Sequence, residues 1–544
     1  MRRRKGATGT LQTFTCKHSI IYHMITTLLR HLIQRALRRS VSGMAAAILA
    51  LLLACPIGAY AEKVKIDALY FNLNSDDATA ETAPPDEEGS YVGGVLTIPE
   101  TVTYGGTTYT VTGIGDDAFS FCTELTSVTI PASVTRIGSY AFAGCKGITS
   151  VYFPSAKLTE IGEAAFDCCE KLASIAIPTT VTTIGSWAFH GCTKLTNISI
   201  PASVKSMGKA VFMRCTGITY AQIQNYGDEV PNEIFDQCTE LRTVRLSDTY
   251  RRVGYAAFYN CNKLTSVEYS DSCRIIAPAA FMSCTSLSVV KLSPLVEEIG
   301  HDAFLACGKL NNIILPDGLR YIGDRAFKDN KSLESIAMTD SVKYLGAEAF
   351  RNCSSLNSIV LSDSVGILDY VFAGCSSLSN IKIPYNATSI GDYAFQNFGG
   401  FEAIDFSERI TSIGEKAFDG CGYIEHVTMP GTIVSIGDFA FAGDSINKLF
   451  AGWDDPVEIT SNTFKYINRL YVPSGKITNY RLKQGWRKAK WFFSVNDPVG
   501  IENIRTDKQS DADDAYYTLD GIRVENPAEG IYIHKGKKIL IRRK

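Results

Sequence analysis

The chain has 544 residues, of which 45% are apolar and 20% are charged, a composition typical of a folded protein that excludes wholesale disorder. Its formal charge is −2, from 54 basic and 56 acidic residues, but positions 1–61 hold nine basic and no acidic side chains. The remainder therefore carries a net charge of −11, which argues against nucleic-acid binding, because phosphate neutralisation needs a basic face.

Residues 1–61 have the features of a secretory signal peptide. A basic stretch precedes the apolar run MAAAILALLLAC (44–55), and Ala59-Tyr60-Ala61 follows as a small-x-small cleavage pattern. We expect cleavage after Ala61. Because the basic stretch is unusually long, we interpret Met24 as the true start of translation.

Two alternatives for this segment remain open. A transmembrane helix needs about 20 apolar residues, and the run is shorter than that. Leu52-Leu53-Ala54-Cys55 resembles a lipobox, in which Cys55 would carry the lipid of a lipoprotein. No other stretch of the sequence is long and apolar enough to span a bilayer. We therefore expect an exported chain at the cell surface, in the outer membrane or free in the medium, with an envelope tether as an open possibility.

A single repeat dominates positions 111–465. The phrase IGxxAFxxCxxL recurs with a 23-residue period, and only two of the gaps between its phenylalanines differ, one longer and one shorter by a single position. The sixteen are Phe119, Phe142, Phe166, Phe189, Phe212, Phe235, Phe258, Phe281, Phe304, Phe327, Phe350, Phe372, Phe395, Phe418, Phe441 and Phe464. This period predicts a leucine-rich-repeat solenoid of about 16 coils, with parallel β-strands on one face and short helical or irregular turns on the other.

Residues 125–145 show how one coil is built. Val128 and Ile130 alternate with polar residues, as in a strand buried on one side, and Pro131 ends the pairing because it lacks an N–H. Phe142 then places a large ring inside. A glycine stands four positions before the phenylalanine in 12 of the 16 copies, where we expect a tight turn or a positive φ. One coil buries too little to fold alone, so stability must come from stacking, with caps at the ends.

Twelve cysteines lie three positions after the phenylalanine of their copy. Disulfides are one interpretation in an exported protein. We favour a ladder of buried free thiols, because stacked equivalents point the same way and the position also accepts Asn330, Phe398 and Asp444. Cys168 and Cys273 fall outside this frame, and of the two we expect Cys273 to be the exposed thiol.

Copies such as LTSVTIPASVTRIGSYAFAGC (125–145) and LASIAIPTTVTTIGSWAFHGC (172–192) resemble the BspA-like leucine-rich repeats. The resemblance covers about residues 110–465, because the Ile-Pro, Ile-Gly, Ala-Phe and Cys marks recur in register. It implies a bacterial surface protein, since characterised members of that family are adhesins that bind host matrix proteins or other microbes.

The segments outside the repeat are predicted to be caps and a sorting module. Residues 62–110 read as an N-terminal β cap, and residues 466–500 as a capping strand and helix in which Trp486 and Trp491 close the core. A polar linker at 501–514 precedes residues 515–544, which are similar to the C-terminal sorting domains of type IX secretion substrates. A plain small β module is the alternative for that tail.

The sequence offers little sign of catalysis. No G-x-S-x-G elbow, P-loop, H-E-x-x-H or C-x-x-C occurs, and only four histidines follow the signal peptide, in separate coils or in the tail. We therefore expect no enzyme activity, no cofactor and no metal site. The outward strand positions remain as a surface for a protein or glycan macromolecule, with Tyr220 and Arg245, one coil apart, as the expected partner-binding anchors. The alternative to an adhesin is an envelope protein that captures glycans or serves a structural role.

Overall fold

The computed structural model describes residues 62–86, 93–154, 157–224, 227–268 and 270–495, and four short strands between residues 516 and 541. The predicted signal peptide with Met24, Cys55 and Ala61, and the predicted linker at 501–514, lie outside the described residues. The chain divides into two compact units, Met1–Thr193 and Lys194–Lys544. Among the helices of the described part, none combines the length and the apolar character that a membrane crossing requires.

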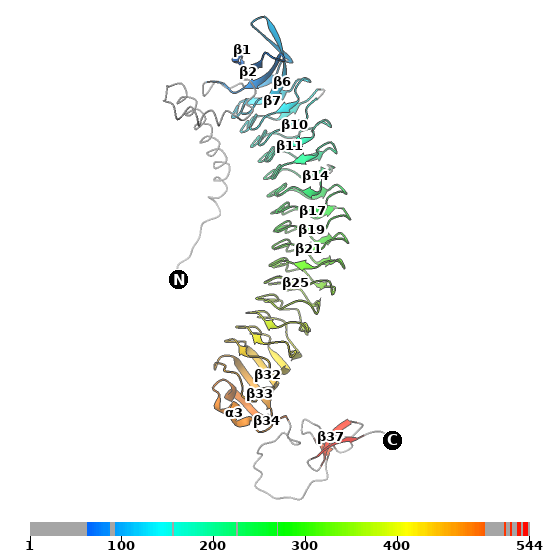
Figure 1. The fold of residues 1–544 in the computed structure, drawn as a ribbon, viewed down its shortest axis with the longest axis vertical. Helices are drawn as coiled ribbons and strands as arrows, with labels where there is room; N and C mark the ends of the chain where they lie inside the picture. The colour runs from blue at the N-terminus through cyan, green and yellow to red at the C-terminus, as the bar shows by residue number, and fades with distance from the viewer. Residues whose placement is uncertain are drawn as a thin grey trace, which may run out of the picture. The chain divides into compact units, whose positions relative to one another are not determined.

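Both units are built from stacked coils, so the predicted leucine-rich-repeat solenoid of about 16 coils is confirmed (Figure 1). Most coils contribute a strand of three or more residues to one parallel sheet and a strand of two residues to another. We call these the long-strand and the short-strand sheets. Each coil is therefore hydrogen-bonded to the next on two separate sides.

In the first unit, an antiparallel hairpin and a third strand precede the coils. They are β1 (Glu62–Ile66), β2 (Leu69–Asn74) and β3 (Thr79–Ala83), and β3 pairs in parallel with β6 (Thr107–Ile114), which also pairs with β5 (Thr101–Tyr104). The long strands are β4 (Gly94–Thr97), β7 (Leu125–Thr129) and β9 (Ser150–Tyr152). The short strands are β8 (Arg136–Ile137), β10 (Glu160–Ile161) and β11 (Thr183–Ile184).

The second unit contains three groups of long strands. They are β12 (Asn197–Ile200), β14 (Tyr220–Ile223), β16 (Thr243–Arg245) and β18 (Ser266–Glu268); β20 (Val289–Lys291), β22 (Asn312–Ile314), β24 (Ser335–Ala337) and β26 (Ser358–Val360); and β28 (Ala403–Asp405), β30 (Tyr423–Met429), β32 (Phe441–Ala451), β33 (Phe464–Val472) and β34 (Ala489–Ser494).

The short strands of the second unit follow the same order. They are β13 (Ser206–Met207), β15 (Glu229–Val230), β17 (Arg252–Val253), β19 (Ile275–Ile276), β21 (Glu298–Ile299), β23 (Tyr321–Ile322), β25 (Tyr344–Leu345), β27 (Ser389–Ile390), β29 (Ser412–Ile413) and β31 (Ser435–Ile436). Between β25 and β27 only an isolated bridge, Ile367 to Ile390, remains, and this interruption falls in the copy that is one residue short.

The stacked phenylalanines form the centre of the core. Phe304 is fully buried, and its ring lies 5.3 Å from that of Phe281 and 5.5 Å from that of Phe327, with interplanar angles of 6° and 3°. Such stacked pairs add about 0.5–1.5 kcal/mol each to the stabilisation that burial of the rings supplies. The prediction that each coil places one ring inside is confirmed.

The segment around each phenylalanine is an irregular turn rather than a helix. Two positions before Phe142, Tyr140 has a φ of 57°, and two positions after it, Gly144 has a φ of 70°. The N–H groups of Tyr140, Phe142 and Gly144 donate to carbonyl oxygens of the next coil at 2.8, 2.8 and 2.7 Å. The residues with positive φ thus turn every second N–H group toward the next coil. These hydrogen bonds join the coils on a third side, in addition to the two sheets.

The glycine four positions before the phenylalanine begins the predicted tight turn, since the Ala326 N–H donates to the Gly323 carbonyl oxygen at 3.3 Å, but it lacks the positive φ. Gly323 does not have a positive φ, but a Cβ on it would stand 2.5 Å from the backbone nitrogen of His301 and 2.7 Å from the carbonyl carbon of Gly300. Gly162 and Gly414 are equally close to the preceding coil. The expectation of a positive φ is therefore wrong. Glycine at this position lets two backbones approach closely, although a few copies carry a side chain there, such as Ala277.

The in-frame cysteines are free thiols that donate hydrogen bonds. Cys307 Sγ donates to the carbonyl oxygen of Phe281 in the preceding coil at 3.1 Å, and Asn330 Nδ2 makes the same bond to Phe304 at 3.0 Å. Burial raises the pKa of Cys307 to about 12, so the thiol keeps the proton that it donates. Every cysteine of the described residues is buried and outside any disulfide, which supports the predicted ladder over disulfides.

The two cysteines outside the frame are also buried. Cys273 is 1% exposed and Cys168 is 6% exposed, so the expectation that Cys273 is the exposed thiol is wrong. The Cys273 Sγ faces the carbonyl oxygen of Ile275 at 3.6 Å. Burial raises the pKa of Cys273 to about 11, which makes this thiol unreactive at neutral pH.

Asp444 is the one acidic residue in the cysteine position among the described coils. Its Oδ1 accepts a hydrogen bond from the Gly422 N–H at 2.8 Å, whereas its buried Oδ2 has no hydrogen-bond partner. Burial raises the pKa of Asp444 to about 7. Since an unfolded aspartate titrates near 4, this group lowers stability progressively as the pH rises from about 4 to about 7.

We expect Asp444→Asn to stabilise the second unit at pH 8 by about 1–3 kcal/mol, because an amide donates as Asn330 does and carries no buried charge. The gain should disappear near pH 4, where the carboxyl group is protonated in both states. The reciprocal change Asn330→Asp should destabilise at pH 8. Urea midpoints of both variants at pH 4.5 and 8 check this, and equal midpoints for Asp444→Asn and the parent at pH 8 would contradict it.

The C-terminal coils end in a short helical segment. The helix α3 (Ile477–Leu482) and the 3-10 helix η1 (Trp486–Lys488) precede β34, and the fully buried Trp486 ring lies 5.5 Å from that of Phe464. Trp486 therefore closes the core as predicted. Trp491 does not, because it is 55% exposed and pairs with Arg469 on the outward side of β34.

The last strands form a separate antiparallel sheet. They are β35 (Tyr516–Tyr517), β36 (Arg523–Val524), β37 (Gly530–His534) and β38 (Lys537–Ile541), in the order β36-β35-β37-β38. The predicted small β module at the C-terminus is present.

Candidate binding face

The side chains that point away from the core along the long-strand sheets form what we call the outward face. In β14, Tyr220 and Gln222 point outward, while Ala221 and Ile223 are buried. The parallel register places Tyr220 beside Thr243 and Gln222 beside Arg245, each one full period further along the chain. The repeat length therefore turns each outward position into a column that runs from coil to coil.

The two predicted anchors lie on this face on neighbouring strands, offset by two positions. Tyr220 is 38% exposed, and the Arg245 side chain is 63% exposed. The Arg245 Nε lies 3.9 Å from Glu268 Oε2 in the next coil, an exposed ion pair worth about 0–1 kcal/mol. Both side chains are therefore accessible to a partner, and the structure offers no further sign that they form one site.

A more apolar part of the outward face lies on β20 to β26. Val289, Ile314 and Val360 are 59, 77 and 59% exposed, and Ile314 pairs with Lys291 of the preceding coil. A hollow of about 750 Å³ is lined by Val289 and Ile314, with other residues of β20 and β22 and the bends that follow these strands, whereas Val360 lies two coils further along. Exposed aliphatic side chains that share one hollow form a candidate surface for a partner. The sequence could have indicated these residues, because each stands at a position of the repeat where the side chain points away from the core.

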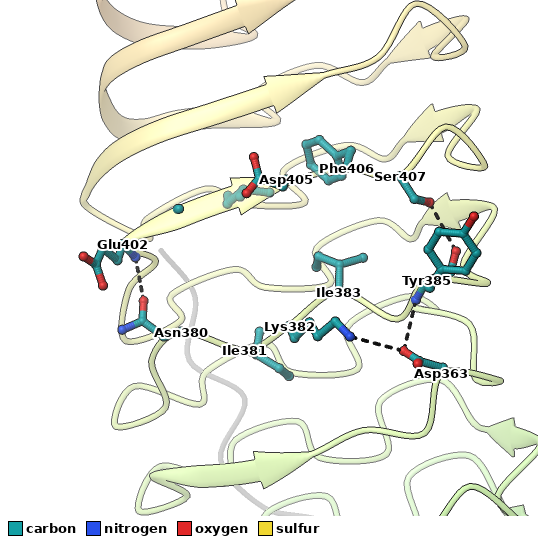
Figure 2. Close-up of a pocket in the computed structure, with 12 residues that line it drawn as sticks. Asp363, Asn380, Ile381, Lys382, Ile383, Tyr385, Glu402, Asp405, Phe406 and Ser407 are labelled. Carbon is teal, nitrogen blue, oxygen red and sulfur yellow. Dashed lines mark hydrogen bonds and ion pairs between the residues drawn. The ribbon is translucent and has the colours of Figure 1, made fainter. Parts of the chain in front are cut away.

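A second hollow, of about 710 Å³, lies where the long-strand ladder is interrupted between β26 and β28 (Figure 2). Residues 381–383 belong to no strand there, and Lys382 reaches to 3.8 Å from Asp363 Oδ1. Tyr385 is 58% exposed, with the Arg409 guanidinium 5.3 Å from the centre of its ring. The hollow therefore combines apolar walls with an exposed aromatic ring and both signs of charge.

The outward face of β32 to β34 carries a column of aromatic rings. Phe450 and Tyr471 stack at 4.6 Å, and Tyr471 and Phe493 stack at 5.0 Å. A third hollow, of about 730 Å³, is lined by Phe450 and extends to Phe406, which also lines the second hollow. The two hollows thus share Phe406 as a wall.

A carboxylate is held ionised on β30, the strand that pairs with β32. Glu425 accepts hydrogen bonds from the Tyr423 hydroxyl at 2.6 Å and from Asn447 at 3.0 Å, and Lys448 lies 3.2 Å away. These hydrogen bonds, that of Tyr423 first, lower the pKa of Glu425 to about 2. This group is therefore a fixed negative charge and not a proton donor at neutral pH.

One group of metal-ligating side chains comes together in the described part of the chain, and it lies beside the phenylalanine turns of the first unit. The atoms of Asp167, Cys168 and His190 that can bind a metal all lie within 4.8 Å of one another. These residues were not predicted as a site, because the expected sign of a metal site was a group of several histidines. The available signal was the spacing of Asp167 and His190, which is one full period, since side chains one period apart are neighbours.

The repeats match a known family over most of the chain. The profile of the BspA type leucine rich repeat region (six copies) matches residues 112–242, 211–330, 290–397 and 347–471, together well over half of the 544 residues. No protein of curated function matches the chain.

Solved structures of bacterial repeat proteins are similar as well. A leucine-rich repeat protein from Bacteroides ovatus is 24% identical with a TM-score of 0.59, over 80% of this chain and 100% of that one, which shows the same fold. A leucine rich cell surface protein from Faecalibacterium prausnitzii is 27% identical with a TM-score of 0.41, over 69% of this chain and 94% of that one. With the profile match spanning residues 112–471, the chain belongs to the family of BspA type leucine-rich-repeat proteins.

Proposed function

We propose that this chain is an exported, non-enzymatic surface protein that binds a macromolecule through its outward face, and that it acts as an adhesin for host or microbial surface proteins. The observation that supports this most is the exposed apolar pair Val289 and Ile314, which line one hollow on β20 and β22. Val360 is exposed two coils further along the column of Ile314. A face without a partner would be expected to carry mainly polar side chains at these positions.

The breadth of the face favours a large partner over a small molecule. Small ligands bind in concave sites that cover most of their surface. The hollows along the outward face instead lie beside exposed strands in successive coils, and they combine apolar walls with exposed rings such as Tyr385. Such a surface suits a protein that presents several side chains at once.

We expect the double variant Ile314→Asp, Val360→Asp to weaken capture of the protein partner at least about 10-fold, since it removes two apolar contacts of more than about 1 kcal/mol and adds unpaired charge. The fold should remain, because both side chains are more than half exposed. Binding to an array of extracellular-matrix and bacterial surface proteins, followed by affinity measurement on each hit, checks this result.

Tyr255→Asp is the matched control, because Tyr255 is 48% exposed but lies beside the phenylalanine turn and not on the outward face. Its binding should equal that of the parent. Equal loss of binding in the control and the double variant would contradict recognition by the outward face.

Glycan capture by a non-adhesive envelope protein is the second candidate, and the stacked rings of Phe450, Tyr471 and Phe493 favour it. Because these rings cover one another's faces, they present a ridge of apolar ring edges along successive strands, against which the C–H groups of a sugar can pack. A glycan array separates the two proposals. Tight glycan binding that Tyr471→Ala abolishes, together with no protein partner, would reverse their order.

Export and anchoring complete the proposal. Cleavage after Ala61 would release a free chain, whereas lipidation of Cys55 would tether it, and a type IX sorting module at residues 515–544 would be removed at the outer surface. Mass spectrometry of the protein from its native cells distinguishes a chain that starts at Glu62 from one that starts at a lipidated cysteine. The same spectrum shows whether the tail is present.

A further inference from the structure

Three side chains of different chemistry converge between two successive coils of the first unit. Asp167 and Cys168 follow Phe166, and His190 follows Phe189 one period later. Their exposed fractions are 6, 6 and 9%. The His190 Nδ1 and Asp167 Oδ1 lie 2.7 Å apart, and the metal-binding atoms of all three residues are within 4.8 Å of one another. No other group of this kind occurs within the residues that the structure describes.

We propose that Asp167, Cys168 and His190 form a zinc-binding site that joins these two coils. Carboxylate oxygen, thiolate sulfur and imidazole nitrogen are the three protein ligand types that Zn²⁺ takes, and a water molecule completes a tetrahedron. Cys168 binds as the thiolate, and its proton goes to solvent. The ion replaces the hydrogen bond between Asp167 and His190, so that the carboxylate and the imidazole both contact one cation.

The backbone holds the ligands in place before an ion binds. The Cys168 N–H donates to the His190 carbonyl oxygen at 2.7 Å, and the Asp167 carbonyl oxygen accepts from the Gly144 N–H at 2.7 Å. Gly191 leaves room beside the thiol, since a Cβ there would stand 3.3 Å from Cys168 Sγ. The site therefore needs small side-chain movements only, which lowers the cost of assembling three ligands.

The chemistry of the site separates it from the cysteine ladder. The in-frame thiols donate to carbonyl oxygens inside the core, as Cys192 does to Phe166 at 3.3 Å. Cys168 instead stands beside a carboxylate and an imidazole, at the only described position where these three groups meet. A soft thiolate with a nitrogen ligand favours zinc over calcium and magnesium, which take oxygen ligands.

The test is zinc titration of the reduced full-length chain against a chromophoric chelator, with Co²⁺ as a spectroscopic probe. We expect one Zn²⁺ per chain, a thermal midpoint that rises with zinc concentration, and a thiolate-to-cobalt absorption band in the Co²⁺ form. Cys168→Ser should remove the band and weaken zinc binding by more than the roughly 10–100-fold that outer-shell changes cost. Asp167→Asn, which keeps the shape of the side chain, should weaken binding but keep the band.

Cys273→Ser is the matched control, because it removes the other buried thiol outside the frame and should leave both the zinc affinity and the band unchanged. If Cys168→Ser does not fold, the Asp167→Asn titration decides alone. Absence of stoichiometric zinc binding, or zinc binding that is unchanged in both Cys168→Ser and Asp167→Asn, would overturn the proposal.

Discussion

Replacement of Phe304 by alanine is expected to lower the free energy of unfolding of the second unit by about 3–5 kcal/mol. The Phe304 ring is fully buried and stacks on the rings of Phe281 and Phe327, so its removal leaves a cavity between two coils and breaks two aromatic contacts. In a solenoid each coil contacts only its neighbours, and the loss should therefore appear as local unfolding around the substituted coil. Urea unfolding with hydrogen exchange measures both the size and the place of the change.

Phe304→Leu is the control for volume, since it keeps an apolar side chain in the same space and should cost less than the alanine variant. Phe439→Ala is the control for position, because the Phe439 ring is 37% exposed. A loss under about 1 kcal/mol for Phe304→Ala would mean that the ring column is not a main source of stability.

The change Gly323→Ala should destabilise the second unit by about 3 kcal/mol, at the upper end of the range for overpacking. The added Cβ meets backbone atoms of the preceding coil at 2.5 and 2.7 Å, so the two backbones next to the short strands β21 and β23 must shift apart to accept it. The gain in helix or strand propensity from alanine is a few times smaller than this strain. Denaturant midpoints and exchange rates of the amides of β23 report the effect.

Gly308→Ala is the matched control, because its Cβ would meet no atom within 4 Å and its φ is not in the left-handed region. The control should be neutral or slightly stabilising. Similar midpoints for the two alanine variants would show that the coils can separate at Gly323 without cost, contrary to the close approach described above.

Much of this fold can be predicted from the sequence, because strand residues that are one repeat period apart pair with each other in the sheets. Tyr220 pairs with Thr243 as the spacing alone requires. The buried phenylalanine column and the free cysteines follow from the same period, since equivalent side chains of stacked coils must point the same way. The C-terminal β module and the closing Trp486 were also within reach of pattern and composition.

The errors come from features that involve the backbone of a neighbouring coil. Gly323 closely approaches the backbone of the preceding coil, which no local pattern reports, and it lacks the expected positive φ. The turn around Phe142 is the irregular one of the two forms that the sequence left open, with left-handed residues such as Tyr140. Cys273 and Trp491 were assigned the wrong exposure because both lie outside the frame, where the period predicts nothing.

The binding surface was predictable as a set of outward positions but not as a site. Tyr220 and Arg245 lie on the expected face. The apolar side chains with the larger exposed fractions are Ile314 and Val360, which were not predicted because only aromatic residues and arginine were considered as anchors. Asp167 and His190 stand one period apart, so the register alone places them together. What the outward face binds depends on the partner's surface, and that information is not in this chain.

Footprinting of the chain in complex with its captured partner tests the central claim most directly. Hydroxyl-radical labelling of the exposed side chains, with and without partner, should show protection at Ile314, Val360 and Tyr385 on the outward face, and unchanged labelling at Tyr255 beside the turns. Protection confined to Tyr255 and its equivalents, with Ile314 and Val360 labelled as in the free chain, would contradict recognition through the outward face.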